Sequence, residues 1–161
     1  MVFLYLQMEK AIIQSPLGTT VIYSDEIGVT KIEVVEEALE ISHEIPEKLR
    51  DAVLQLQEYF EGKRKEFTVP LFSPGSDFQN KVWTALQNIP YGAVRSYKEQ
   101  SFAIDKPEAI RAVANANGAN RISILIPCHR VVGSNGELTG YGGGLWRKKW
   151  LLELEKKKAK I

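Results

Sequence analysis

The chain has 161 residues, of which 44% are hydrophobic and 25% charged, and its formal net charge is +1. This is enough apolar material for one buried core or two small ones, and no apolar run is long enough to span a membrane. Met1 to Leu6 is short and has no basic start, so we expect no signal peptide. Cys128 is the only cysteine, which excludes an internal disulfide. We expect a reducing, intracellular location: the cytoplasm, or the nucleus if the source is eukaryotic.

The first part of the chain predicts a small sheet followed by a helix. Helical spacing of Leu49, Val53, Leu56 and Phe60 predicts a helix from Pro46 to Glu61. The β-rich segments before it are separated by turns; they lie at 12–13, 20–23 and 29–34. After the helix, the composition of 67–71 favours one more strand.

The segment Phe72-Ser73-Pro74-Gly75 is the best candidate linker, because the charge balance changes sign there. Residues 1–75 carry 7 basic and 13 acidic side chains, whereas residues 76–161 carry 14 and 7. We therefore expect two subdomains, an α/β one over 1–75 and a second over 76–161, and we expect a polyanion to contact only the second. The lysines of 156–160 contribute to this charge, and we expect them to form a solvated, frayed tail.

The second part predicts short helices. Ser76 to Gln79 and Ser96 to Glu99 are capping-box patterns, each of which opens a helix. Pro107 favours the start of another helix that ends near Asn117, with Ile110, Val113 and Asn117 on one face. Two short helices joined by a three-residue turn predict a helix-turn-helix.

The most informative residue is Cys128, within Ile126-Pro127-Cys128-His129-Arg130-Val131. It follows the apolar run Ile122 to Ile126, which is typical of a strand. A thiol beside an imidazole is a candidate nucleophile with a base nearby, because the thiolate is the reactive form. The alternative is that a lone cysteine is simply a small buried hydrophobe. The other histidine, His43, is expected to be structural or exposed.

The motifs around Cys128 resemble those of one family, the O6-alkylguanine-DNA alkyltransferases. The resemblance covers about Phe78 to Glu155, and the first 75 residues match only in general layout. It rests on Asn120, the run 122–126, Pro127 to Gly133, Gly140-Tyr141-Gly142-Gly143-Gly144 and Trp150-Leu151-Leu152.

The resemblance implies an α+β fold, with a small antiparallel sheet in the N-terminal subdomain. The C-terminal subdomain would be mostly helical, with the helix-turn-helix and the Cys128 loop. It also implies direct reversal of damage in double-stranded DNA, by a single-turnover transfer of the alkyl group of O6-alkylguanine to Cys128. A monomer without cofactor is expected, and O4-alkylthymine stays open as a second substrate.

The same resemblance assigns catalytic roles. It implies a relay from Cys128 through a water to His129, which Glu155 orients. Tyr97 would give a proton to the guanine ring as it leaves. From the residues alone, Glu155 is a solvated acid on a helix and Tyr97 lies at the edge of the core.

The helix-turn-helix would bind DNA in this family. By resemblance, Arg111 fills the space of the flipped base, Tyr97 helps to rotate the nucleotide out, and Ala112 and Ala114 allow close approach. The alternatives from composition are an exposed helix cation and simple helix propensity. By the same resemblance, the substrate pocket would be formed by Asn120, Val131, Tyr141, Gly142 and Gly143.

Three departures from the family bear on these expectations. Relatives often have glycine at the position of Ala114, and some have serine or alanine at that of Gly142. Some also hold zinc in the first domain through cysteines and histidines, but this chain has no cysteine there, so we expect no metal.

Two rival hypotheses remain. One is a damage-sensing DNA binder of the same fold with feeble transfer, and the other is an unrelated thiol hydrolase that uses Cys128 and His129. The intact Cys128, His129 and Glu155 argue against the first. Neighbouring side chains on an extended strand point apart, which argues against direct proton transfer in the second.

Overall fold

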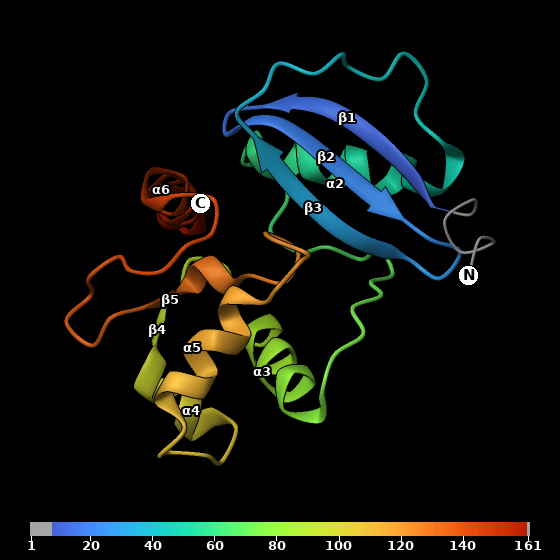
Figure 1. The fold of residues 1–161 in the computed structure, drawn as a ribbon. Helices are drawn as coiled ribbons and strands as arrows, with labels where there is room; N and C mark the ends of the chain where they lie inside the picture. Colours follow the sequence, from blue (N-terminus) through green and yellow to red (C-terminus); the bar gives the residue numbers. More distant parts are fainter. Residues whose placement is uncertain (1–7, 161) are drawn as a thin grey trace. The chain divides into compact units, whose positions relative to one another are not determined.

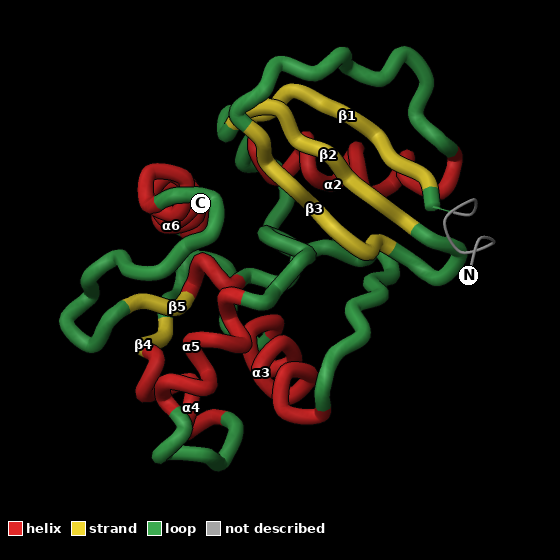
Figure 2. The backbone as a smooth tube through the Cα atoms, in the orientation of Figure 1, coloured by secondary structure: helices red, strands yellow, loops and turns green. Residues whose placement is uncertain are grey.

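The protein is described by a computed structural model over residues 8–160, and the expectation about Met1 to Leu6 lies outside them. The chain forms two compact units that divide between Ser73 and Pro74. The first contains an antiparallel sheet and a helix, and the second is mainly helical (Figures 1 and 2). The fold is therefore α+β, with a small antiparallel sheet at the N-terminal side.

The sheet of the first unit has three antiparallel strands in the order β1-β2-β3. The strands are β1 (Glu9–Ser15), β2 (Gly18–Ser24) and β3 (Val29–Val35), so the three β-rich segments are confirmed. A tight turn joins β1 to β2, where Ser15 pairs with Gly18. The Asp25 carboxylate accepts hydrogen bonds from the backbone N–H groups of Ile27 and Gly28, which closes the next turn.

One helix covers a face of this sheet (Figure 1). The 3₁₀ turn η1 (Glu47–Leu49) leads into α2 (Arg50–Phe60), so the predicted helix is confirmed. Its inward residues are buried, as are those of the sheet opposite, and this apolar layer is the core of the unit. The most deeply buried members are Ile22, Leu49, Leu56 and Tyr59.

The prediction of a strand over 67–71 is wrong. Only Leu71 pairs with the sheet, as a single parallel bridge to Val29. Pro70 has no N–H to continue a ladder, and Thr68 is bound by the Gln55 side chain instead of by a strand.

As far as residue 160, the second unit contains four α-helices and a short parallel sheet. The helices are α3 (Asp77–Gln87), α4 (Tyr97–Ala103), α5 (Ile110–Gly118) and α6 (Leu145–Ala159). The strands β4 (Arg95–Ser96) and β5 (Val131–Val132) pair in parallel. Both predicted capping boxes are present: the hydroxyls of Ser76 and Ser96 accept from the N–H groups of Gln79 and Glu99, and the N–H groups of the two serines donate to the Gln79 and Glu99 side chains.

Helices α4 and α5 form the helix-turn-helix, but α5 begins three residues later than predicted. The N–H of Ala109 donates to Lys106, so 106–109 form a turn, and the first helical bond runs from Val113 to Ala109. As expected, Val113 and Asn117 are buried. Ile110 is 41% exposed and does not share their buried face.

Two further expectations are wrong. The run Ile122 to Ile126 is a buried turn rather than a strand, with one bridge between Ser123 and Ile126 and a positive φ of 76° at Ile124. The lysines after Glu155 are not frayed, because α6 continues to Ala159. A Cβ at Gly92 would lie 2.4 Å from the Cβ of Ala159, so the end of α6 packs against that glycine.

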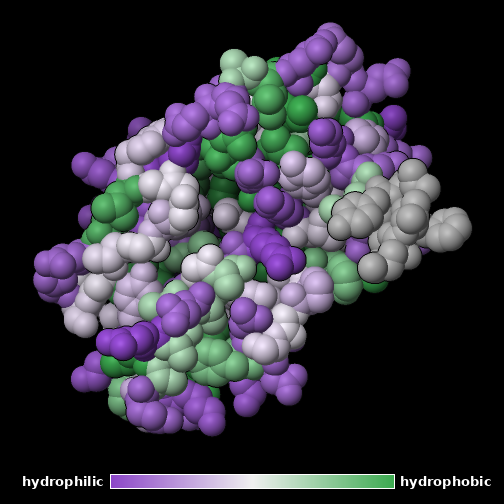
Figure 3. All heavy atoms as spheres, viewed as in Figure 1, coloured by the Kyte–Doolittle hydropathy of each residue, from purple (hydrophilic) through white to green (hydrophobic). Residues whose placement is uncertain are grey.

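Hydrophilic side chains cover much of the face that Figure 3 shows, with apolar side chains scattered between them. Over residues 8–160, no helix combines the length and the apolar character that crossing a bilayer requires.

Candidate active site

Cys128 lies at the start of η2 (Cys128–Arg130), a single 3₁₀ turn that follows Pro127. Its backbone N–H donates to the carbonyl of Ile126 at 2.8 Å. In a 3₁₀ turn, successive side chains are rotated by about 120° about the axis, so Cys128 and His129 point to different sides. The thiol is partly buried, whereas the imidazole has no exposed surface.

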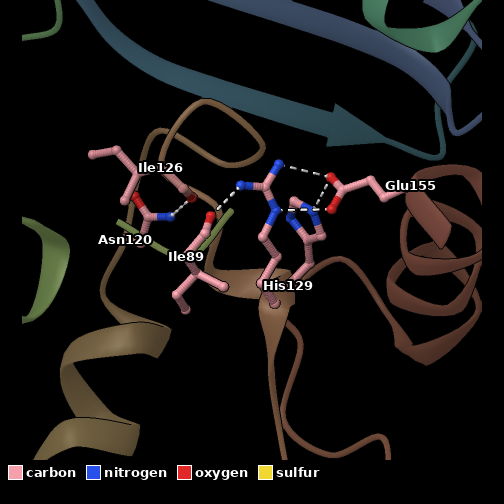
Figure 4. Close-up of polar contacts among 6 residues, drawn as sticks. Ile89, Asn120, Ile126, His129 and Glu155 are labelled. Carbon is pink, nitrogen blue, oxygen red and sulfur yellow. Dashed lines mark hydrogen bonds and ion pairs between the residues drawn. The ribbon is translucent and has the colours of Figure 1, made fainter. Parts of the chain in front are cut away.

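Asn120 organises the turn that precedes the cysteine (Figure 4). Its Nδ2 donates to the carbonyl of Ile126 at 2.8 Å, and its Oδ1 accepts from the N–H of Ile122 at 3.0 Å. Both ends of the turn are thus fixed by one amide, which explains how Ile124 is kept in a costly left-handed conformation.

Burial raises the pKa of the Cys128 thiol, while the hydrogen bond from Asn120 and the charge of Lys148 oppose the increase. The thiol is therefore protonated at neutral pH until a base removes its proton. Asn120 and Lys148 both stabilise the thiolate once it forms.

The Nε2 of His129 lies 2.7 Å from Oε2 of Glu155, and both side chains are buried (Figure 4). The Nδ1 of His129 is also buried and has no hydrogen-bond partner among the described residues. Burial lowers the pKa of His129 and outweighs the opposing effect of Glu155. The imidazole is thus neutral at pH 7, with Nε2–H donating to Glu155 and Nδ1 able to accept a proton.

Arg130 completes the pairing of Glu155. Its Nε and Nη2 donate to the two carboxylate oxygens at 2.8 and 3.1 Å, and its Nη1 donates to the carbonyl of Ile89 at 2.7 Å. Burial alone would raise the pKa of Glu155, but its bonds to His129 and Arg130 outweigh this and lower the pKa to about 2. The carboxylate is therefore ionised, which fixes the imidazole tautomer.

Lys148 brings a second buried cation to the site. Its side chain has no exposed surface, and its Nζ donates to the carbonyl of Thr139 at 2.7 Å. Burial lowers the pKa of Lys148 and the Cys128 thiolate raises it, so the two groups interact electrostatically. The same Nζ lies 6.0 Å from the centroid of the Tyr97 ring, and the Tyr97 hydroxyl donates to the same carbonyl at 3.3 Å.

The short sheet connects α4 to the site. Arg95 pairs with Val131 and Ser96 with Val132, and Tyr97 follows directly as the first residue of α4. Val131 is fully buried. The pairing thus explains why Tyr97, from the helix-turn-helix, lies beside residues of the Cys128 region.

The glycine-rich segment Tyr141 to Gly144 also lies near Cys128. Burial and the thiolate charge of Cys128 raise the pKa of Tyr141. Gly142 is exposed, and a Cβ at Gly143 would lie 3.1 Å from the Tyr141 ring. These glycines therefore allow the backbone to pass close to the tyrosine.

The predicted DNA-contacting residues of α5 lie apart from this cluster. Arg111 and Ala112 are exposed and Ala114 is partly exposed. None of the contacts around Cys128 described above involves these three residues. They form an accessible face of α5 instead.

The sequence interpretation missed Arg130 and Lys148. Arg130 follows His129 in the motif and precedes two valines. An arginine next to apolar residues can indicate a buried ion pair, and this signal could have identified it. Lys148 stood between two other basic residues, a pattern that usually lies in solvent. His43 is exposed as expected, 3.0 Å from Glu40. Over residues 8–160, no three His, Cys, Asp or Glu side chains are grouped so that they could hold a metal ion.

Two family models match the chain, and together they cover nearly all of it. Residues 77–157 match the DNA-binding domain of 6-O-methylguanine DNA methyltransferase, and residues 8–72 match the ribonuclease-like domain of the same family.

Relatives matched over nearly their whole length carry the name of the same family. The methylated-DNA–protein-cysteine methyltransferase of Mycobacterium tuberculosis H37Rv is 48% identical over 151 residues, 91% of this chain and 92% of the relative. The protein of that name from Methanosarcina barkeri is 46% identical over 149 residues, 89% and 94% of the two chains.

Solved structures give the same result. The crystal structure of the M. tuberculosis O6-methylguanine methyltransferase has a TM-score of 0.84 at 44% identity and covers 94% of each chain. A structure of the M. tuberculosis protein in complex with DNA has a TM-score of 0.83 at 46% identity, covering 92% of this chain and 93% of that one. The chain thus belongs to the 6-O-methylguanine DNA methyltransferase family.

Proposed function

We propose that this protein repairs DNA by direct reversal, transferring the alkyl group of O6-alkylguanine to its own Cys128. The observation that carries the proposal is the buried Cys128 region, with a neutral His129 bound to an ionised Glu155 at 2.7 Å, in a chain matched over nearly its whole length by one family.

In the proposed reaction, the Cys128 thiol loses its proton to Nδ1 of His129 through a bridging water. The imidazolium that forms is stabilised by Glu155. The sulfur attacks the alkyl carbon, so the S–C bond forms as the C–O6 bond breaks. The electron pair of the broken bond stays with the guanine.

The leaving guanine needs a proton, because its anion is a poor leaving group. Tyr97 is proposed as the donor. The resulting phenolate would be stabilised by Lys148, whose Nζ lies 6.0 Å from the Tyr97 ring centroid. The product is a thioether at Cys128, and the chain has no second thiol that could accept the group. The protein therefore acts once.

The pocket is proposed to be lined by Asn120, Val131, Tyr141, Gly142 and Gly143. The base must leave the stack to reach it, since Cys128 is partly buried. Arg111, Ala112 and Ala114 on α5 would contact the duplex, and Arg111 would occupy the vacated space. We assign these contacts to the catalytic and DNA-binding subdomain, residues 76–161, and we assign the α/β subdomain to residues 1–75.

We infer a monomer that acts on double-stranded DNA inside the cell, in the cytoplasm or, in a eukaryote, the nucleus. The need for a reduced thiol supports the location. No cofactor is required, because the chain's own thiol and bases supply every step. Transfer from O4-alkylthymine stays an open second reaction.

The test is intact mass after mixing with excess duplex that contains O6-methylguanine. One methyl per chain is expected, mapped to Cys128, and the Cys128→Ala variant should gain none. DNA binding without mass gain would favour the damage-sensing hypothesis. Repeated turnover of an ester by the thiol would favour the hydrolase hypothesis.

A further inference from the structure

The first turn of α6 has an unusual distribution of side chains. Trp146 is 52% exposed, whereas the neighbouring Arg147 is only 6% exposed. On a surface helix the indole normally faces the core and the guanidinium faces solvent. Here the guanidinium carbon of Arg147 lies 4.6 Å from the Trp146 ring centroid. The aromatic ring therefore shields the cation, which strengthens the polar contacts that Arg147 makes.

Arg147 uses this position to bind the glycine-rich segment. Its Nη1 donates to the carbonyl of Gly143 at 2.7 Å, and its backbone N–H donates to the carbonyl of Gly144 at 3.2 Å. A Cβ at Gly143 would lie 3.1 Å from Cε2 of Tyr141 and 3.4 Å from Cδ of Arg147. Gly143 is thus packed between the tyrosine ring and the arginine side chain.

The carbonyl of Gly144 also accepts from the backbone N–H of Lys148 at 3.3 Å. Gly140 and Gly144 have φ angles of 55° and 97°, which glycine adopts readily. Three consecutive glycines lose much conformational entropy when they are fixed in one shape. The N–H of Gly144 donates to the carbonyl of Tyr141 at 3.0 Å, which closes one turn. The Arg147 side chain adds a tether from outside that turn.

We propose that Trp146 and Arg147 are positioning residues that hold Tyr141 to Gly144 in place as a wall of the substrate pocket and thereby limit the size of the alkyl group that reaches Cys128. The inference rests on the proposed function, because it assigns selectivity to the same pocket. Tyr141 connects the two, since its ring lies against Gly143 and the charge of a Cys128 thiolate raises the pKa of its hydroxyl.

The main test measures selectivity. Trp146→Ala and Arg147→Met should loosen the wall, so methyl transfer should fall roughly tenfold because the reacting groups are less well oriented. A benzyl group needs more room, so transfer from O6-benzylguanine should fall less. The ratio of benzyl to methyl rate constants, both measured in duplex DNA, should therefore rise about fivefold or more. Trp146→Phe keeps an aromatic ring over the guanidinium, so its ratio of benzyl to methyl rate constants should stay near that of the wild type.

A second measurement reports on the wall directly and needs no activity. Amide hydrogen exchange at Gly144 should become faster in Trp146→Ala and Arg147→Met, and stay near wild type in Trp146→Phe. Lys149→Ala is the matched control, because Lys149 is exposed on the same helix and lies 3.9 Å from the exposed Glu153. Trp146→Ala removes an exposed side chain, so it tests the proposal even where Arg147→Met fails to fold.

Two results would overturn the proposal. One is an unchanged rate ratio together with unchanged exchange at Gly144. The other is a loss in Trp146→Ala confined to duplex substrates, with free O6-benzylguanine unaffected, which would make Trp146 a DNA contact. Failure of wild-type protein to accept a methyl group would refute the proposed function instead, and the exchange measurement would still decide whether the pair holds the segment.

Discussion

The carboxylate of Glu155 accepts from three nitrogen atoms, Nε2 of His129 and Nε and Nη2 of Arg130, at 2.7, 2.8 and 3.1 Å. A buried charge is tolerated when it is paired and its lone pairs are satisfied. Arg130 therefore affects His129 as well as Glu155, although it binds only the carboxylate of this pair. It keeps Glu155 ionised, and the ionised Glu155 keeps the proton of His129 on Nε2.

Glu155→Gln should destabilise the protein at pH 7, by about 3 kcal/mol, because it leaves the buried guanidinium of Arg130 without its counter-ion. The folded-state pKa of Glu155, about 2, lies below the ordinary 4.5. The carboxylate therefore contributes stability above pH 4.5 and loses it as the pH falls towards 2. Urea unfolding at pH 7 and at pH 3 should show the gap between wild type and variant narrowing at the lower pH.

The same variant should transfer methyl roughly 10- to 100-fold more slowly, while its affinity for DNA changes little, because the imidazole loses the group that orients it. The thiol pKa, followed through its reaction rate across pH, should rise. Glu153→Gln is the matched control, since Glu153 is exposed on the same helix. A rate profile identical to wild type would show that Glu155 supports only the fold.

At the scale of residues, the sequence identifies candidate site residues, but it predicts their burial and their contacts less well. The motif pointed to Cys128 and His129, and the resemblance added Glu155. Lys148 was not found, because nothing in a run of three basic residues marks the middle one as fully buried. Its burial follows from the carbonyl of Thr139 and the ring of Tyr97, which are contacts that only the fold creates.

Among the elements, α5 offers a way to test DNA binding separately from chemistry. Arg111 is exposed on α5 and belongs to none of the contacts around Cys128. Arg111→Ala should therefore slow transfer from duplex DNA by roughly tenfold or more, because nothing fills the space of the flipped base. Transfer from free O6-benzylguanine should be nearly unchanged, since the free base needs no flipping. Single-turnover rates on the two substrates measure the difference.

Arg50→Ala provides the control for that experiment. Arg50 is also an exposed arginine on a helix, but it lies in α2 of the first unit. Both of its rates should match wild type. Equal losses on duplex and free base in Arg111→Ala would mean that Arg111 supports the pocket or the fold.

Local signals predicted the helices well because their determinants lie within a few residues. The capping boxes at Ser76 and Ser96 fix the starts of α3 and α4. The run Ile122 to Ile126 has strand composition, yet the Asn120 side chain bonds both of its ends and makes it a turn. The strand predicted over 67–71 does not form for a similar reason, since Gln55, 13 residues earlier in the chain, binds the backbone of Thr68. Composition cannot reveal partners outside the segment.

At the scale of the whole molecule, the charge is unevenly divided, with 14 basic and 7 acidic residues in 76–161 and the reverse excess in 1–75. The structure shows which charged residues can be substituted to test the role of this division without disturbing the fold. Arg95 is partly buried and donates to Gln100 at 2.7 Å, so reversing its charge would disturb the fold. Deleting the chain after Glu155 would remove the end of α6, which packs against Gly92. Substitution of exposed lysines avoids both problems.

If phosphates contact only the second unit, the affinity for duplex DNA should fall steeply with salt, with a slope proportional to the number of phosphates neutralised. Lys98→Glu, at an exposed position of α4, should reduce that slope by about one. Lys48→Glu, exposed in the first unit, should leave it unchanged. The double variant Lys156→Gln with Lys157→Gln neutralises two exposed lysines of α6 without shortening the helix. Titrations between 50 and 200 mM salt, about the range over which such contacts dominate, give the slopes. A slope reduced by the double variant but not by Lys98→Glu would move the DNA-binding face from the helix-turn-helix to the end of α6.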